Sequence, residues 1–421
     1  MTVQSNNFLI KYFIPVQQGI PERRYDLDWL RILVFGLLIF YHIGMLYVAN
    51  WGFHFKSAYQ SETLANFMLI VEPWRMASLW IISGIAIRFI LVKVSLLRYT
   101  FVRSLRLLLP LLFGVLVIVP PQLYVEMTAN GVLDMSYWQF YLTMFTDNNS
   151  LFKDYQPGIW PHWDVNHLWY LRSLWEYSLA IIILLPLLNS SYITSASNWM
   201  FKQHIAVIIL MLTIPIFIIQ ISWNQDTNRY PLGFTFLLYG YLIGWHASFW
   251  QQLKVNVKAL LLTFIVLLTV FIIFYNTVWL TLDDSTPPWL IIIGMLIYSL
   301  VRVVGVLMVL ALAYKYLNKK SASLSYFNDA VYPFYIVHQT IIIVLAYNLT
   351  PMALGPIIEP LSVILFTILL CLISFEAIRR IDILKPLFGV RIKKNYSTTI
   401  RNIGYGFGCL LIIPIGLEIL L

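Results

Sequence analysis

The sequence predicts an all-α, polytopic membrane protein, a helical bundle of about 10–11 transmembrane helices. Of its 421 residues, 60% are hydrophobic and only 11% are charged, and the mean hydropathy is +0.77. Soluble domains carry about 25% charged residues, so this composition excludes an ordinary soluble protein. Apolar runs of the roughly 20 residues that a membrane helix needs recur along the whole chain.

The apolar runs predict the order of the membrane spans. A mixed segment, residues 1–28, precedes the first run, which is too long for a cleaved secretory signal. We expect one transmembrane domain over residues 29–377, with a long aromatic-rich loop at 128–166. A basic segment, 378–403, separates this domain from a final helix at 404–421. The predicted spans are 29–49, 66–91, 105–127, 167–189, 203–222, 232–250, 258–280, 288–313, 327–348, 357–377 and 404–421.

The distribution of basic residues predicts the orientation of the chain. Most of the 28 lysines and arginines fall in segments on one side of the predicted spans, while Lys56, Lys153 and Arg229 fall in loops on the other. The positive-inside rule therefore places the N-terminus in the cytoplasm. Insertion into a lipid bilayer explains the net charge of +9, so no nucleic-acid partner is expected. Cys371 and Cys409 both lie in apolar runs, which argues against a disulfide or metal framework.

The first span carries two ionisable residues, which a bilayer interior discourages unless they have a function. Arg31 stands at its entrance, and His42 follows eleven residues later, close to three helical turns and about 16 Å along the axis. Arginine suits phosphate binding, and a buried neutral histidine suits general-base catalysis. This spacing fits a long donor such as acyl-CoA, whose phosphates and thioester lie at opposite ends. The alternative is a capping arginine and a histidine bonded to a neighbouring helix.

Further polar residues lie in the second and third spans. Glu72, Arg75 and Ser83 share one helical face, and the glycine after Ser83 allows a neighbouring helix to approach closely. Arg75 is a candidate to hold an anionic acyl group or acceptor, or else forms a structural ion pair with Glu72. Arg103 and Arg106, three residues apart, are candidates to bind the donor phosphates, or else belong to the ordinary positive-inside charge.

The long loop ends in a cluster of aromatic and ionisable residues where the fourth span begins. Trp163, Asp164, His167 and Trp169 lie within seven residues. Indole rings present flat apolar faces with a polar edge, which suits sugar binding. The alternative is an aromatic belt at the membrane interface. The spacing of the two histidines here, His162 and His167, matches no recognised zinc pattern, so no metal is expected.

Three residues are candidates to orient His42. Asp164 is the first candidate and Glu72 the second. His338, in the ninth span, reaches a similar depth to His42 and is either a further member of the site or a polar packing residue.

Taken in order, these motifs resemble the acyltransferase-3 family of membrane O-acyltransferases, and within it the branch that succinylates periplasmic glucans. The resemblance implies transfer of an acyl group from cytoplasmic acyl-CoA to an extracytoplasmic sugar hydroxyl. His42 would be the essential residue and Arg31 would help to hold the donor. The family's usual core has ten spans, so the eleventh predicted span departs from it. The motifs are Tyr25-Asp-Leu-Asp28-Trp-Leu-Arg31-x10-His42, Arg75-Met76 with Ile82-Ser83-Gly84, Arg103-x2-Arg106 up to Pro110, Asn166-His167-Leu168-Trp169-Tyr170-Leu171, and Tyr335-Ile-Val-His338-Gln339.

The sequence and the resemblance together predict an O-acyltransferase of the bacterial cytoplasmic (inner) membrane. Its donor would be succinyl-CoA, with acetyl-CoA as the rival, and its acceptor a hydroxyl of a glucan or another glycan. The alternative is a transporter or flippase for an acyl donor or glycan, since buried arginines and histidines also serve transport pathways. A transporter predicts paired broken spans in two related halves, and no such repeat is evident in the sequence. Direct transfer, an acyl-histidine intermediate and pairing as a homodimer all stay open.

Overall fold

The computed structural model describes residues 23–146, 150–152, 163–224, 227–244, 246–283, 285–391 and 399. Within these ranges the chain is helical and forms no strand, apart from an isolated bridge between Val48 and Ser61. Nine helical segments in the described residues are long and apolar enough to cross a membrane. The predicted all-α, multi-pass membrane fold is therefore confirmed. The predicted span 404–421 lies outside the described residues, and the predicted domain boundaries stay predictions.

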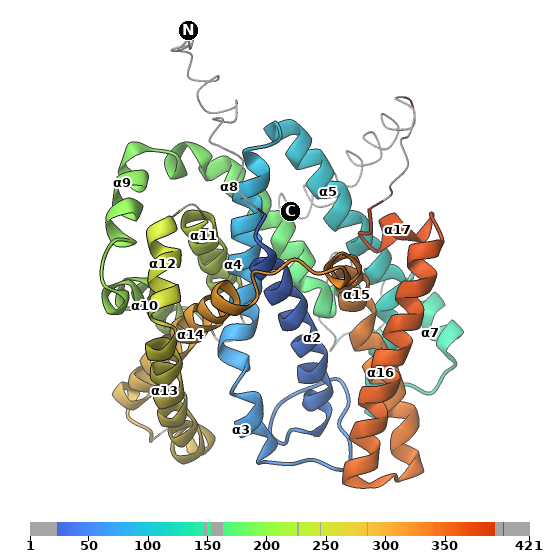
Figure 1. Ribbon diagram of the computed structural model, residues 1–421. Helices are drawn as coiled ribbons and strands as arrows, with labels where there is room; N and C mark the ends of the chain where they lie inside the picture. The colour runs from blue at the N-terminus through green and yellow to red at the C-terminus, as the bar shows by residue number, and fades with distance from the viewer. Residues whose placement is uncertain are drawn as a thin grey trace. The chain divides into compact units, whose positions relative to one another are not determined.

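The nine spanning segments are α2, α3 with α4, α5 through η1 to α6, η3 with α8, α10, α13 with η4, α14, α15 with η5, and α16 (Figure 1). The helix bounds are α2 Tyr25–Tyr47, α3 Leu64–Met68, α4 Glu72–Leu91, α5 Leu96–Phe113, η1 Gly114–Ile118, α6 Pro120–Ala129, α7 Tyr137–Thr143, η2 Ser150–Phe152, η3 Asn166–Leu168, α8 Trp169–Leu188, α9 Ser191–Met200, α10 Ile205–Ser222, α11 Arg229–Ile243, α12 Ala247–Val255, α13 Val257–Thr277, η4 Trp279–Thr281, α14 Pro288–Tyr316, α15 Ser323–Leu349, η5 Thr350–Met352, α16 Gly355–Arg380 and α17 Leu384–Leu387.

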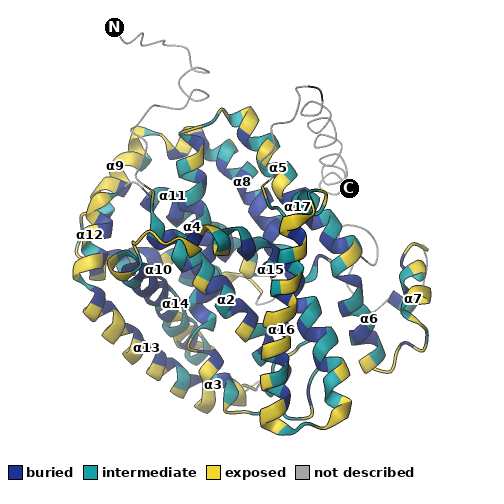
Figure 2. Ribbon diagram, turned by 45° about the vertical axis from the view of Figure 1, so that its right-hand side comes forward, coloured by how far each residue is buried: buried dark blue, intermediate teal, exposed yellow. Residues whose placement is uncertain are grey.

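Two of the spanning helices show the apolar exposed face that contact with lipid requires. On α16, exposed large apolar side chains recur every four residues at Leu361, Leu365, Leu369 and Ile373. Exposed residues likewise follow one side of α13 in Figure 2. Residues four apart lie on one helical face. Such a face is unfavourable in water and suits a hydrocarbon environment, which agrees with the membrane assignment.

The predicted span at 232–250 is wrong. The structure instead forms α11, which ends at Ile243 before Gly244, and then the separate short helix α12. In α12, Phe249, Trp250 and Leu253 are buried, whereas Gln251 and Lys254 are exposed. The first residues of α12 are largely apolar and follow α11 closely, so the sequence reads as one continuous apolar run.

The chain divides into two compact units. The first unit comprises Met1–Val34, Asn66–Tyr99 and Tyr177–Leu324, and the second comprises Phe35–Ala65, Thr100–Glu176 and Ser325–Leu421. In the first unit α4 packs against α11 and α14, and α14 also contacts α10, α12 and α13 (Figure 1). The division falls inside α2, so Arg31 belongs to the first unit and His42 to the second.

Glycines allow α4 and α11 to pack at backbone contact. A Cβ atom added at Gly84 would lie 2.0 Å from the carbonyl oxygen of Leu237, and one added at Gly240 would lie 2.1 Å from that of Ile81. Real Cβ atoms do not approach other atoms so closely. Small residues at helix interfaces are a general device of membrane proteins, and the predicted close approach at Gly84 is confirmed.

In the second unit, a π-helix and two prolines interrupt the third spanning segment. Pro120 and Pro121 follow η1 and donate no backbone N–H, so carbonyls one turn earlier lose their helical partners. The hydroxyl of Tyr141 donates to the carbonyl oxygen of Leu116 at 3.1 Å, and the hydroxyl of Thr340 donates to that of Ile118 at 2.6 Å. Such re-satisfaction is required inside a membrane, and π-bulges are frequent at functional sites.

An apolar core of the second unit brings α2, α15 and α16 together. Buried residues of α2, among them Ile39, Ile43 and Leu46, pack with Ile342 of α15 and Val363 of α16. His42 lies between Ile39 and Ile43 in sequence, so this core fixes the part of α2 that carries the histidine.

Candidate functional site

The second unit pairs two histidines inside its spanning helices. His42 Nδ1 on α2 lies 2.9 Å from His338 Nε2 on α15. The two rings are nearly parallel, with 8° between their planes. His338 is fully buried, whereas His42 is half-buried. Of the three residues predicted as candidates to orient His42, His338 is the one whose ring the structure places against it.

The hydrogen bonds of His338 define which nitrogen of each ring carries the proton. His338 Nδ1 lies 2.7 Å from the carbonyl oxygen of Tyr335 and 3.1 Å from that of Phe334. Carbonyl oxygens only accept, so Nδ1 is the protonated nitrogen, and Nε2 of the neutral ring accepts. His42 Nδ1 must then donate to it. In the neutral pair, His42 Nε2 therefore carries the basic lone pair.

A third histidine, His167, is held in a buried polar network next to this pair. Its Nε2–H donates to the carbonyl oxygen of Ile336 at 3.0 Å, and its Nδ1 accepts from Gln122 at 3.3 Å. Its ring lies 5.4 Å from that of His338, nearly perpendicular to it. Gln339 Nε2 contacts the amide oxygens of Gln122 and Asn166 at 3.1 and 2.9 Å. Both ring nitrogens of His167 thus have protein partners. Its predicted substrate role stays a prediction.

Two residues that the sequence did not single out join this network. His54 Nδ1–H donates to the carboxylate of Glu126, and His54 Nε2 faces Gln339 Nε2 at 3.2 Å. His54 lies in the segment after α2, and Glu126 lies near the end of α6. The signal that could have indicated them is weak: Gln122 and Glu126 are polar residues four apart on one face of an apolar helix.

A lysine side chain binds carbonyl oxygens at the end of α2 beyond His42. Lys56 Nζ donates to the carbonyl oxygens of Met45 at 2.8 Å and Val48 at 2.5 Å. Met45 is among the last residues of α2, whose carbonyls have no intrahelical partner, and Val48 directly follows the helix. Burial lowers the pKa of the Lys56 ammonium from its ordinary value.

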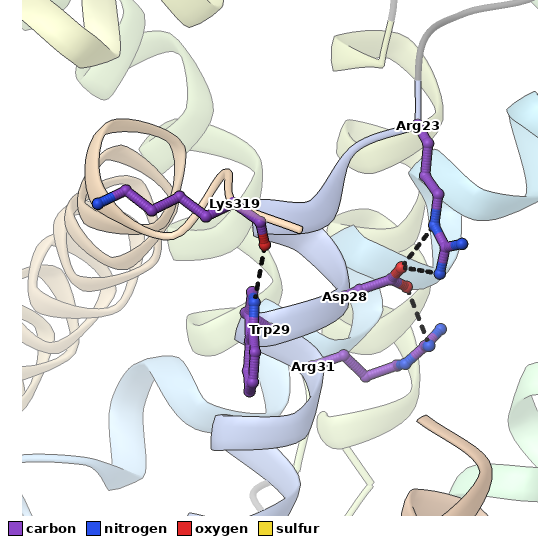
Figure 3. Close-up of polar contacts among 5 residues, drawn as sticks. All are labelled: Arg23, Asp28, Trp29, Arg31 and Lys319. Atoms are coloured by element: carbon purple, nitrogen blue, oxygen red, sulfur yellow. Dashed lines mark hydrogen bonds and ion pairs between the residues drawn. The ribbon is translucent and has the colours of Figure 1, made fainter. Parts of the chain in front are cut away.

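In the first unit, an ion-pair cluster holds the guanidinium of Arg31. Figure 3 shows the Asp28 carboxylate between two arginines, accepting from Arg31 Nη2 at 3.2 Å and from Arg23 Nη2 at 3.1 Å. The neighbouring Trp29 donates its indole N–H to the carbonyl oxygen of Lys319 at 3.2 Å. The Arg31 side chain is 35% exposed, so a ligand can reach it. Its predicted donor-binding role stays a prediction.

The other predicted donor contacts are in the second unit. Arg103 is half-buried and Arg106 is exposed on α5, and the Tyr332 hydroxyl of α15 donates to the carbonyl oxygen of Arg106 at 3.1 Å. Arg106 is thus exposed on the unit that contains the histidine pair. Donor binding at these two arginines is untested.

Three predicted residues lie on α4 in the first unit. The carboxylate of Glu72 accepts from the Tyr298 hydroxyl, Arg75 is buried, and Ser83 is half-buried. Arg302, one turn from Tyr298 on α14, donates to the carbonyl oxygen of Pro73 at 3.2 Å. The orienting role of Glu72 and the ligand roles of Arg75 and Ser83 stay predictions.

The residues predicted around the aromatic loop differ in exposure. Asp164 is exposed, and Trp169 is half-buried. Trp163 is buried, with its ring 5.0 Å from Phe145 and 6.2 Å from Tyr141. Burial shows that Trp163 packs within the loop, while its predicted sugar contact, like that of Trp169, is untested. Within the described ranges, no group of three or more histidine, cysteine or acidic residues is placed to hold a metal ion.

Fold and site together define a multi-pass membrane protein with a histidine pair buried among its spanning helices. Residues 24–376 match the acyltransferase-3 model, described as an acyltransferase domain, so the chain belongs to this family and is a membrane acyltransferase. It is similar to glucans biosynthesis protein C of Escherichia coli O1:K1, at 24% identity over 380 residues, which cover 87% of this chain and 94% of that protein. The proteins of the same name from strain ED1a of serotype O81 and from O157:H7 are 24% identical over 386 and 380 residues, with the same coverage. No solved structure matches the chain.

Proposed function

We propose that this acyltransferase moves an acyl group from cytoplasmic acyl-CoA to a hydroxyl of an extracytoplasmic glucan or related glycan. The observation that carries the proposal is the hydrogen bond between His42 Nδ1 and His338 Nε2. Because His338 Nδ1 is tied to the Tyr335 carbonyl, this bond makes His42 Nε2 the basic nitrogen. A membrane acyltransferase needs one such base within its spanning helices.

In the proposed reaction, His42 Nε2 removes the proton of the sugar hydroxyl as the oxygen attacks the thioester carbonyl carbon. The carbon–sulfur bond then breaks, and the CoA thiolate leaves with the proton that His42 took up. His338 is a positioning residue that accepts from Nδ1–H and stabilises the imidazolium through that bond. A general base of this kind contributes roughly 100-fold to 10,000-fold to a rate.

The donor phosphates are assigned to arginines because the planar guanidinium pairs with phosphate through two parallel hydrogen bonds. Arg103 and Arg106 belong to the same unit as His42 and lie three residues apart on α5. Arg31, eleven residues before His42 on α2, is the further proposed contact. The charge bias of the loops supports placing these arginines on the cytoplasmic side.

The glucan acceptor is supported by the printed name of the similar proteins from Escherichia coli. Succinyl is the favoured acyl group because of the motif resemblance, and acetyl is the rival. The free carboxylate of a succinyl group would need a cation, for which Arg75 is the proposed candidate.

Purified protein in sealed liposomes tests the proposal. Labelled succinyl-CoA or acetyl-CoA is supplied on one side of the membrane and a glucan on the other, and alkali-labile label on the glucan is counted. We expect label to reach the glucan as an ester, and the preferred donor identifies the acyl group. Label that crosses the membrane without forming an ester would instead support a transporter. Absence of both ester and crossing, with either donor and protein shown to be folded, would contradict the proposal.

A further inference from the structure

A pair formed by one histidine and one carboxylate lies near the end of α2 that is opposite to Arg31. His54 follows the last residue of α2 by seven positions, and its partner Glu126 lies on α6. Their side chains are 20% and 25% exposed. The mechanism above uses neither residue. A solute can reach this partly exposed pair, unlike the fully buried His338.

The hydrogen bonds leave part of the carboxylate available to a ligand. A carboxylate only accepts, so His54 Nδ1 carries the proton, and Nε2 is the acceptor nitrogen of the ring, 3.2 Å from Gln339 Nε2. Glu126 Oε2 accepts from His54, whereas Glu126 Oε1 has no hydrogen-bond partner among the described residues. The protein thus holds an acceptor oxygen on a side chain that is partly exposed.

An aromatic ring connects this pair to the catalytic histidine. The ring of Phe53 lies 6.4 Å from that of His42 and 5.2 Å from that of His54. The two histidine rings are therefore no farther apart than these two separations combined, a distance that one or two sugar residues bridge. Phe53 packs against the apolar core of α2, α15 and α16 and, being only partly buried, offers an apolar ring surface next to both histidines. This is the arrangement that a sugar ring, with apolar C–H faces and hydroxyls at its edge, complements.

The charge of Glu126 discriminates between the two substrates. A carboxylate is an acceptor for the hydroxyl donors of a neutral glycan. It repels the phosphates of acyl-CoA and the free carboxylate of a succinyl group. The pair therefore favours the acceptor over the donor at this end of α2.

We propose that Glu126, held by His54, is an acceptor-binding subsite that accepts a hydrogen bond from a glycan hydroxyl, with Phe53 under the sugar face. The ligand class is a neutral oligosaccharide that carries neighbouring hydroxyls. This inference rests on the proposed function, because it assigns the acceptor to the same reaction. Glu126 and His54 act in binding, while His42 acts on the hydroxyl that reacts.

The test compares Glu126→Gln with Glu62→Gln, which makes the same change at an exposed residue of the same unit. Initial rates of ester formation are measured against glucan concentration at saturating donor. Because a hydrogen bond to a charged acceptor is lost, Glu126→Gln is expected to raise the acceptor KM by about tenfold to hundredfold. The KM for the donor and the acceptor-independent hydrolysis of acyl-CoA are expected to match wild type. Glu62→Gln is expected to match wild type in every constant.

An unchanged acceptor KM in Glu126→Gln would overturn the inference and leave the proposed function standing. So would an equal fall in glucan transfer and donor hydrolysis, since that pattern indicates a structural role. If Glu126→Gln does not fold, His54→Leu replaces it, because loss of the N–H donor releases the carboxylate and raises the same KM.

A binding measurement separates failure of this inference from failure of the proposed function. Glucose trisaccharides of different linkage are titrated into the full-length protein without donor, and tryptophan fluorescence is followed. Weaker binding by Glu126→Gln than by Glu62→Gln supports the subsite even if no acyl transfer is found. Equal binding by the two variants, or no binding by the wild type, would overturn it.

Discussion

Replacing His338 with leucine or glutamine separates orientation of His42 from simple packing. His338 is fully buried, accepts from His42 Nδ1 at 2.9 Å and donates to the Tyr335 carbonyl at 2.7 Å. His338→Leu fills similar space but offers no acceptor, so His42 Nδ1–H is left without this partner. Leaving such a buried donor unsatisfied costs about 1–3 kcal/mol of unfolding free energy. The His42 ring is then able to turn or to exchange its tautomer.

The catalytic effect should exceed what this loss of stability explains. Misplacing the basic nitrogen forfeits much of the roughly 100-fold to 10,000-fold that a general base supplies. We therefore expect kcat of His338→Leu to fall by about 100-fold or more, with donor and acceptor KM values little changed. In His338→Gln the amide oxygen can accept from His42 Nδ1–H, so most of the activity should return.

The assay is ester formation on glucan by purified protein in liposomes, with folding checked by thermal melting. Tyr326→Phe is the matched control, because Tyr326 lies on the same helix as His338 and the change removes its 2.9 Å hydrogen bond to Glu376. It should lower the melting temperature slightly and leave kcat unchanged. Wild-type kcat in His338→Leu, or an equal defect in folded His338→Gln, would refute the reasoning.

Three further predictions follow from the packing and the ion pairs. Gly84→Ala should lower the free energy of unfolding by about 1–3 kcal/mol, because its Cβ would overlap a backbone carbonyl. Gly36→Ala, which has open space around the added Cβ, should be neutral or stabilising. Equal melting temperatures of the two variants would contradict this prediction. Thr340→Val should lower the melting temperature, because it removes the donor to the carbonyl that ends η1, and an unchanged value would count against that role. Asp28→Asn should raise the donor KM by up to about fivefold, because a part-exposed ion pair to Arg31 contributes no more than that. An unchanged or lower donor KM would show that Asp28 does not position Arg31 for the donor.

The sequence predicted the membrane fold because hydrophobic length and charge bias are local properties. The limits of α10 and α14 lie within a few residues of their predicted spans. The predicted span at 232–250 was wrong because the first residues of α12 are largely apolar and follow α11 closely in the sequence. Burial of α12 through Trp250 depends on tertiary contacts that composition does not encode.

For the site, the sequence identified His42 and His338 separately, because each is an ionisable residue in an apolar run. It ranked Asp164 and Glu72 ahead of His338 as candidates to orient His42. Only the packing of α2 against α15 brings the two histidines together. His54 and Glu126 were missed for the same reason: they are 72 residues apart in the chain, and the spacing of Glu126 with Gln122 is only a weak signal.

The central claim, that His42 carries out the transfer, is tested most directly by the rate of His42→Ala in the liposome assay. The control is His204→Asn, which changes an exposed histidine and retains a side chain able to cap α10, as His204 does through Ala206 N–H. We predict that ester formation on glucan falls by at least about 100-fold in His42→Ala and matches wild type in His204→Asn. Equal transfer by wild type and folded His42→Ala would contradict the claim.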